Sequence, residues 1–325
     1  MDLICTSWSS LATYGFKPDT LVIGNGASIN IHRSFAYEAL KDSAGDEVRK
    51  IMEQANEHDF EALLSRLSTA LNVLDMYDFE FDDAIEKITQ TQNKVKNGLI
   101  AAVTSVHPAA YPPLAKKLKP LATFAAQFNT VLSLNYDLLL YWATYSVGSD
   151  KPAHFMDCWN SGSFSFDAPK YRRTKGSKPV LVFYPHGNLF INATVTGAEQ
   201  KVASGYGKSL LEVIRESLKE RSFPLFVSEG ESEKKLSQIR SSDYLSYVLQ
   251  KQIKEKSIGS TCFYGCSFND RDNHIWLPLL EKSDFTVAVV YDDNDQERFR
   301  RACWSAKVSG SVYVTSPADT LMWAG

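Results

Sequence analysis

The chain has 325 residues, of which 44% are hydrophobic and 22% are charged, and its formal net charge is −3. These values are typical of a globular protein, and they exclude the strongly basic surface that nucleic-acid and anionic-membrane binders use. The five cysteines are scattered and odd in number, which argues against a disulfide framework and favours a reducing cytoplasm.

Neither a membrane nor a nucleic acid is expected as a partner. No apolar run approaches the roughly 20 residues that cross a bilayer, and the start of the chain lacks the basic and apolar regions of a secretory signal. One basic segment is interpreted as a solvated loop. Its residues are Lys170, Arg172, Arg173, Lys175 and Lys178.

The first predicted strand, residues 21–23, ends in two glycines, Gly24 and Gly26, which Ser28 follows. An apolar strand, a Gly-x-Gly turn and a helix, here predicted over residues 29–40, are typical of a nucleotide-binding start of an α/β domain. The third glycine of the dinucleotide fingerprint is replaced by isoleucine. The motif alone therefore fits a tight turn equally well.

The segment from residue 45 to residue 126 has a different character. Its apolar residues recur every three or four positions, as at Val48, Ile51 and Met52, and no convincing strand interrupts them. We interpret it as an all-helical insertion between the first and second strands of a sheet. The remaining residues, 1–44 and 127–325, form the predicted Rossmann-like domain.

Strands and helices alternate after the insertion. This order predicts an α/β fold with a mostly parallel sheet and helices on both faces. Residues 1–20 are predicted to be irregular or weakly helical, and residues 154–165 to form a loop. Strands are predicted at 130–134, 180–184, 189–191, 225–228, 260–264, 286–291 and 311–315, and helices at 138–145, 208–221, 241–256, 270–282 and 296–304.

Polar residues follow the carboxyl ends of these strands. Because those ends share one edge of a parallel sheet, we expect the side chains to converge on one site. Each also has a structural interpretation: Asn135 and Asp137 as helix caps, Ser267 with Asp270 as an N-cap pair, and His186 as a turn histidine. The full set is Ser28, Asn135, Asp137, His186, Glu229, Ser267 and Asp270.

Taken in order, these motifs resemble those of the sirtuin-like family. The resemblance covers the sheet framework, chiefly residues 21–40, 130–145, 180–230 and 260–293, and leaves out the helical block. The motifs are Gly24-x-Gly26-x-Ser28, Asn135-x-Asp137, His186-Gly187 and Gly265-x-Ser267.

The departures from that family point to one branch of it. The four-cysteine zinc ribbon of the deacylating members is absent, and Cys266 stands where they have a threonine. The chain is more similar to zinc-free bacterial relatives that consume NAD in phage defence. Asp59-Phe60-Glu61, in the helical block, also looks like an element of those proteins, although an N-capped helix explains it equally well.

The resemblance implies a cytoplasmic NAD glycohydrolase that acts in abortive infection. Asn135 would hold the nicotinamide ribose or the attacking water, and Asp137 would orient the carboxamide or brace the loop. His186 would act as general base, with a pKa near neutrality. No metal is implied. The five other histidines, among them His107 and His274, are interpreted as structural or exposed.

NAD is the implied substrate. The glycine turns and neighbouring hydroxyls would hold its pyrophosphate, and an acid at a strand end would meet the adenosine ribose. The predicted NAD-binding residues are Gly24, Asn25, Gly26, Ser28, Gly265, Ser267, Asp270 and Asp292, with Asp293 as an alternative to the last.

Other functions fit the same fold. One is an NAD-dependent protein deacylase or ADP-ribosyltransferase, and another is a sensor that binds NAD or ADP-ribose without catalysis. A dehydrogenase is disfavoured because no second substrate domain is evident. An unrestrained NAD hydrolase would be toxic, so we expect control by self-association or by a phage-derived protein, with the helical block as regulator or interface.

Overall fold

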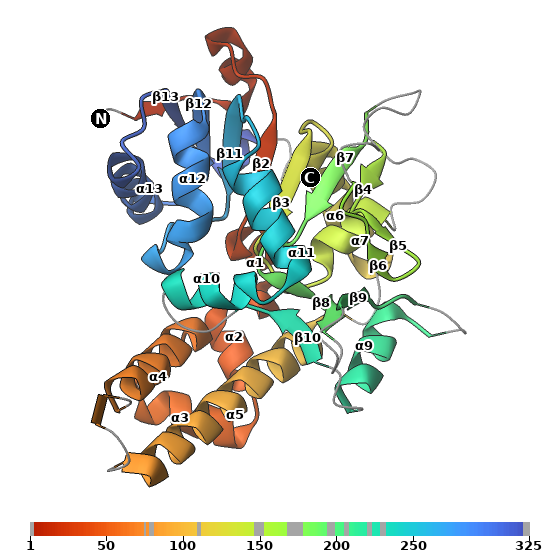
Figure 1. Cartoon of the computed structure of the whole chain (residues 1–325). Helices are drawn as coiled ribbons and strands as arrows, with labels where there is room; N and C mark the ends of the chain where they lie inside the picture. The colour runs from red at the N-terminus through yellow and green to blue at the C-terminus, as the bar shows by residue number, and fades with distance from the viewer. Residues whose placement is uncertain are drawn as a thin grey trace.

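The computed structural model describes residues 3–74, 76–77, 81–108, 112–145, 153–167, 178–193, 199–204, 208–219, 223–227 and 232–320. Its centre is an eight-stranded sheet in the order β1-β13-β12-β11-β2-β3-β7-β4, in which every neighbouring pair is parallel (Figure 1). The strands are β1 (Ile4–Cys5), β2 (Thr20–Ile23), β3 (Thr130–Ser133), β4 (Phe155–Met156), β7 (Val180–Phe183), β11 (Ser260–Tyr264), β12 (Phe285–Val289) and β13 (Ser311–Thr315).

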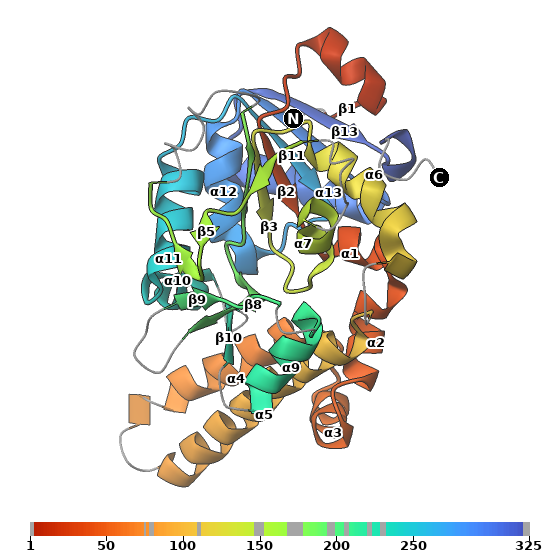
Figure 2. The same ribbon diagram turned by 90° about the vertical axis from the view of Figure 1, so that its right-hand side faces the viewer.

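Helices cover both faces of this sheet, which confirms the predicted α/β class. Strands β2, β3, β7, β11 and β12 are buried along their whole length, as expected for parallel strands with two covered faces. Figure 2 shows α11 and α12 on one face and α1 and α6 on the other. The helices are α1 (Asn25–Ile31), α6 (Ala115–Ala125), α7 (Leu139–Tyr145), α11 (Asp243–Tyr247), α12 (Asn273–Lys282) and α13 (Asp293–Ser305).

Strand order reverses next to β2. From β2 the chain moves outward through β3 to β7, whereas β11, on the other side of β2, leads outward to β12 and β13. Two loops diverge at this switch point, and ligands of doubly wound sheets bind in the resulting crevice.

Two predicted strands belong to a different sheet. β8 (Gly187–Ala193) pairs antiparallel with β9 (Glu199–Lys201) and with β10 (Phe223–Phe226), so the strands predicted at 189–191 and 225–228 lie outside the parallel sheet. Apolar content alone does not distinguish the two sheets, because the pairing partner of a strand is a tertiary property.

Three further local predictions differ from the structure in whole or in part. The predicted loop at 154–165 contains β4 and a hairpin of β5 (Trp159–Asn160) and β6 (Ser163–Phe164). Residues 1–20 contain the 3-10 helix η1 (Trp8–Tyr14), in line with the weakly helical prediction, but also β1, which was not predicted. The helix predicted over 29–40 breaks at His32, whose backbone is extended, into α1, η2 (Arg33–Phe35) and α2 (Tyr37–Asp42). The strands are too short for a periodic pattern to identify them.

Four helices form what we call the helical lobe, below the sheet in Figure 1: α2, α3 (Asp46–Gln54), α4 (Phe60–Leu74) and α5 (Asp82–Val106). Every helix or strand that the structure describes within the predicted insertion is a helix. Its last helix, α6, packs on the sheet instead, where the Phe124 ring lies 4.7 Å from that of Trp8 and 5.7 Å from that of Tyr264.

The remaining elements connect the lobe and the sheet. They are α9 (Leu210–Lys219), α10 (Ser232–Arg240), the π-helix η5 (Val248–Lys254) and the 3-10 helices η4 (Pro112–Leu114), η6 (Asp270–Asp272) and η7 (Pro317–Asp319). Within the described part of the chain, no helix has both the length and the apolar character that crossing a bilayer requires. Glu229 and the basic segment up to Lys175 lie outside the described residues.

Candidate functional site

A cavity of about 320 Å³ lies at the switch point of the sheet. Its volume is in the range of small-molecule sites. It is lined by the loops that follow β2 and β11, by residues after β3 and β7, and by the start of α4 in the helical lobe. Asn135, Tyr136 and His186 are among the lining residues, together with Asp59 and Glu61 from the lobe.

Glycines from two loops form what we call the glycine floor: Gly24 and Gly26 after β2, and Gly265 after β11. The Gly24 amide donates to Tyr264 O at 2.9 Å, and the Gly26 amide donates to Gly265 O at 3.0 Å. A Cβ on Gly24 would lie 2.4 Å from Gly265 O. Glycine is required here for the loops to approach each other, and the two amides expected to hold a pyrophosphate are already paired within the protein.

The side-chain amide of Asn135 has a hydrogen-bonded nitrogen and an oxygen without a partner among the described residues. Its Nδ2 donates to Gly24 O at 3.1 Å and to Ser28 Oγ at 2.7 Å. Its Oδ1 is buried and has no hydrogen-bond partner among the described residues. A buried acceptor without a partner costs about 1–3 kcal/mol, so this oxygen calls for an explanation beyond stability.

Asp137 and Ser28 hold the loop rather than face the cavity with free groups. Ser28 Oγ donates to Asp137 Oδ2 at 2.5 Å, and Asp137 Oδ1 accepts from the Leu139 amide at 2.8 Å at the start of α7. Burial raises the pKa of Asp137 above its ordinary value, against the opposing effect of the hydrogen bond from Ser28. Asp137 is thus a helix cap and a brace for Ser28.

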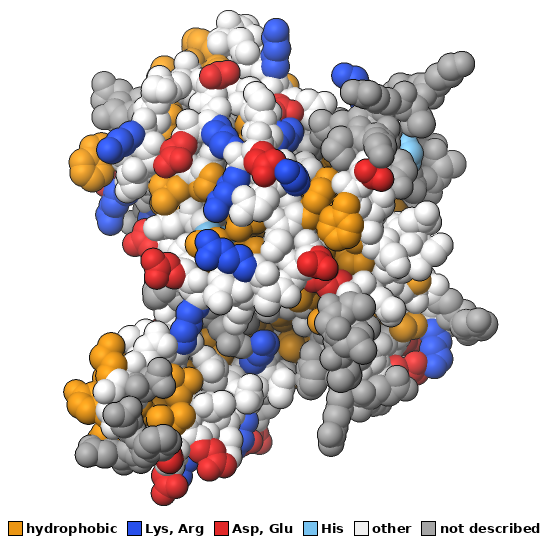
Figure 3. All heavy atoms as spheres, viewed as in Figure 1, with side chains coloured by type: hydrophobic (Ala, Val, Ile, Leu, Met, Phe, Trp, Pro, Cys, Tyr) orange, Lys and Arg blue, Asp and Glu red, His pale blue; other side chains and the backbone are white. Residues whose placement is uncertain are grey.

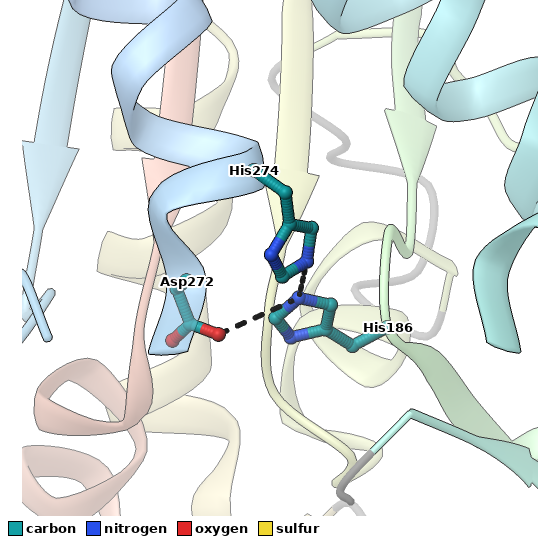
Figure 4. A group of neighbouring side chains, drawn as sticks. All are labelled: His186, Asp272 and His274. Atoms are coloured by element: carbon teal, nitrogen blue, oxygen red, sulfur yellow. Dashed lines mark hydrogen bonds and ion pairs between the residues drawn. The ribbon is translucent and has the colours of Figure 1, made fainter. Parts of the chain in front are cut away.

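His186 follows β7 and is buried at the cavity wall. The next residue, Gly187, has φ of 80° and allows β10 to approach closely, because a Cβ there would lie 1.7 Å from Leu225 O. The His186 Nε2 atom is 3.0 Å from the Nε2 atom of His274 and 3.7 Å from Asp272 Oδ1 (Figure 4). His274 Nδ1 is in turn 3.0 Å from Ser232 Oγ.

Both imidazoles are neutral at neutral pH. Burial, and then the nearby Lys235 ammonium, lower the pKa of His186 to about 3. Burial and His186 lower the pKa of His274 to about 2. The expectation that His186 has a pKa near neutrality is therefore wrong, because that expectation assumed a solvated ring.

Five charged residues, which we call the ionic wall, join the lobe to the sheet: Asp59, Glu61, Lys235, Arg271 and Asp272. Lys235 Nζ donates to Glu61 Oε2 and to Asp272 Oδ1, both at 2.8 Å, although the lysine side chain is fully buried. Burial lowers the pKa of Lys235, but the two carboxylates outweigh it and hold this pKa above its ordinary value. Arg271 Nη2 donates to Asp59 Oδ2 at 3.0 Å.

The ionic wall explains the Asp59-Phe60-Glu61 motif of the sequence. Phe60 is buried in the core, and the acids on either side of it pair with Arg271 of η6 and Lys235 of α10. Glu61 Oε1 also accepts from the Tyr136 hydroxyl at 3.0 Å. The motif therefore fixes the helical lobe against the cavity.

The structure brings together most of the predicted site residues. Ser28, Asp270 and Asp292 do not line the cavity. Ser28 is buried and bonded to Asn135 and Asp137. Asp270 is exposed at the start of η6, and exposed Asp292 caps α13 by accepting from the Asp295 amide at 2.8 Å. The predicted residues that line the cavity are Gly24, Asn25, Gly26, Asn135, Asp137, His186, Gly265 and Ser267.

Several residues at the site were missed from the sequence. His107, interpreted as structural or exposed, is buried and structural, since the Leu138 amide donates to its Nε2 at 2.9 Å. His274 and Asp272 carried a weak signal, because they follow the second glycine loop closely. Lys235 carried none, because it stands in a charged segment typical of a solvated helix face.

The match to known families covers this site. A family model described as a domain of unknown function, DUF4917, matches residues 21–308, which include the sheet strands from β2 to β12, the helical lobe and the cavity. No curated protein matches the chain.

Proposed function

The chain belongs to the DUF4917 family, and we propose that it is an enzyme that hydrolyses NAD to nicotinamide and ADP-ribose. The single observation that carries the proposal is the unpartnered Oδ1 atom of Asn135, held at the wall of a cavity that His186 and both glycine loops also line. The resemblance of these motifs to the sirtuin-like family supports the choice of NAD.

The reaction breaks the bond between the nicotinamide nitrogen and the ribose. Nicotinamide leaves with the bonding electron pair, water adds to the positively charged, oxocarbenium-like carbon, and the water gives up a proton. Asn135 Oδ1 accepts a hydrogen bond from the ribose or from that water. Because Nδ2 is held by Gly24 and Ser28, the orientation of this acceptor is fixed before substrate binds.

His186 takes the proton. Its neutral ring has a lone pair to offer at neutral pH, and the Asp272 carboxylate at 3.7 Å stabilises the imidazolium that forms. The ionic wall at the same cavity holds three carboxylates and two cations, and its net negative charge favours the cationic nicotinamide ring of the substrate over an anionic group.

Purified protein incubated with NAD tests the proposal, with free nicotinamide measured by chromatography. Asn135→Ala and His186→Ala are each expected to lower turnover about 100-fold or more, since each removes a group that acts on the reacting atoms. Asn160→Ala, which removes an exposed asparagine of the β5–β6 hairpin, is the matched control.

Circular dichroism must show that the variants keep the parental fold. Nicotinamide release by either variant at the parental rate would refute the assignment. NAD binding in calorimetry without any nicotinamide release would identify a sensor, and NAD-dependent turnover of an acetylated peptide would identify a deacylase.

We further propose that the enzyme is an effector of phage defence whose activity is controlled through the helical lobe. The role in phage defence rests on the resemblance to the zinc-free relatives, and two observations support control through the lobe. The ionic wall links the lobe to the cavity, and hydrophobic side chains gather at the tip of α4 and α5, where Val73, Met76 and Phe81 are exposed (Figure 3). Mass measurement by size exclusion, with and without a phage-derived trigger, tests the control. A monomer that is fully active alone would exclude it.

A further inference from the structure

His186, Asp272 and His274 form a compact cluster of metal-ligating side chains. One ligand atom from each, the two Nε2 atoms and a carboxylate oxygen, lie within 4.8 Å of one another. Figure 4 shows Asp272 and His274 on the same descending segment, with His186 reaching them from the neighbouring strand end. The three side chains come from η6, α12 and the loop after β7, so no sequence spacing indicated the cluster.

The distances are close to those of a tetrahedral site. Two ligand atoms, each about 2.0–2.1 Å from one zinc ion, lie about 3.3 Å apart. The two Nε2 atoms are 3.0 Å apart, and His186 Nε2 is 3.7 Å from Asp272 Oδ1. The ligand atoms of His274 and Asp272 lie within 4.8 Å of each other, so a movement of the Asp272 side chain, which is 19% exposed, would place all three atoms around one ion.

The surroundings prepare the ligands for a cation. Ser232 Oγ contacts the Nδ1 atom of His274 at 3.0 Å, which is the second-shell contact that orients a ligating imidazole and leaves Nε2 for the metal. Glu61 and Asp272 supply two negative charges, and Lys235 supplies one positive charge between them. The cluster therefore keeps one net negative charge beside two neutral imidazoles.

We propose that this cluster is a binding site for a divalent transition-metal ion such as zinc, with ligands His186 Nε2, His274 Nε2 and the Asp272 carboxylate and with a fourth position toward the cavity. Binding needs an unprotonated Nε2 atom on both rings: where His186 carries its proton on Nε2, that proton shifts to Nδ1 of the same ring and none is lost. His and carboxylate ligands suit zinc, copper or nickel better than magnesium or calcium.

Metal binding would also regulate the proposed enzyme. An ion on His186 Nε2 occupies the group that we assign as general base, so metal binding is expected to inhibit NAD hydrolysis. This consequence rests on the proposed function, whereas the binding site itself does not. A titration without NAD therefore separates failure of the metal site from failure of the enzymatic assignment.

Zinc binding to chelator-treated full-length protein tests the site by calorimetry, and the visible absorption of cobalt reports its geometry. Because the thiol of Cys5 is exposed, all proteins carry Cys5→Ser. We expect one equivalent of zinc on the parent and on the control His58→Gln, which removes an exposed histidine. We expect loss of this equivalent in His186→Gln and His274→Gln, and about 10–100-fold weaker binding in Ser232→Ala.

The parent titration decides the outcome even where a variant folds poorly. Absence of zinc binding to the parent would overturn the site. Retention of the equivalent at parental affinity by His186→Gln or His274→Gln, with a parental thermal melt, would show an adventitious ion elsewhere and would also overturn it.

Discussion

The glycine floor and the ionic wall enclose the same cavity but are held by different forces. The floor is held by uncharged backbone hydrogen bonds between Gly24, Gly26, Tyr264 and Gly265 at 2.9–3.0 Å. The wall is held by charged pairs at 2.8–3.0 Å that join α4 to η6 and α10. One side therefore depends on the absence of a side chain, and the other on the presence of opposite charges.

This difference separates the roles of the two sides. Backbone contacts within a parallel sheet have few alternative arrangements, so the floor is a fixed reference for whatever binds above it. Ion pairs between two packed units depend on the presence and the desolvation of both partners, so a change at either partner alters the contact. We therefore expect a substitution in the glycine floor to cause a large loss of stability, and substitutions in the ionic wall to cause smaller, graded losses.

The largest effect is expected for Gly265→Ala. Gly265 has φ of 64°, and a Cβ there would lie 2.4 Å from the Ala27 amide nitrogen. Left-handed strain and overpacking together should lower the free energy of unfolding by about 3 kcal/mol. Urea denaturation measures the loss. Gly259→Ala, where a Cβ meets no atom within 4 Å, is the control and should stay within about 0.5 kcal/mol of the parent. Equal losses in both variants would show that the floor is not held by close approach.

A smaller loss is expected for Lys235→Met, which leaves Glu61 and Asp272 facing each other without a cation. Breaking a buried pair costs about 3–5 kcal/mol, but these carboxylates are 27% and 19% exposed, so we expect about 2 kcal/mol. The same denaturation experiment measures it. In the control, Lys251→Met, the lysine and its partner Glu255 are each 54% exposed, and the loss should be about 0.5 kcal/mol or less. A parental stability for Lys235→Met would mean that the ionic wall holds nothing together.

The smallest change in stability, counted per histidine and per pH unit, is expected on acidification. The unfolded chain protonates histidine near pH 6.5, whereas the folded pKa values of His186 and His274 are about 3 and about 2. Folding therefore resists proton uptake: stability is complete above about pH 6.5 and is lost as pH falls toward the folded values. Each histidine should contribute about 1.4 kcal/mol per pH unit well below pH 6.5, and about 1 kcal/mol between pH 6.5 and pH 5.5.

Denaturation at pH 6.5 and pH 5.5 measures this slope. His274→Gln should make this slope shallower by the contribution of one histidine. His58→Gln, which replaces an exposed histidine, is the matched control. A parental slope in His274→Gln would contradict the neutral buried pair. NAD turnover should not fall over this range through protonation of His186, since that ring stays neutral.

Particular elements show how far sequence patterns reach. The strands predicted at 260–264 and 311–315 match β11 and β13, because short buried apolar runs between turn signals are unambiguous when helices flank them. The strand predicted at 189–191 exists within β8 but lies in another sheet, and β1 was missed, because both depend on a partner distant in sequence. Among site residues, Asn135 and His186 were found because they end strands, whereas His274 and Lys235 sit inside helices, where pattern indicates only packing or solvent.

The sequence by itself determined the alternation of strands and helices, the glycine turns and the polar strand ends, since these follow from local periodicity and backbone freedom. Only the tertiary structure decided that Asp137 braces a loop, that His186 pairs with His274, and that the lobe reaches the cavity through Glu61 and Lys235. The physical reason is that burial and neighbouring charges set the pKa of a side chain and decide which of its hydrogen-bonding groups stay unpaired. Both arise from residues that meet only when the chain folds.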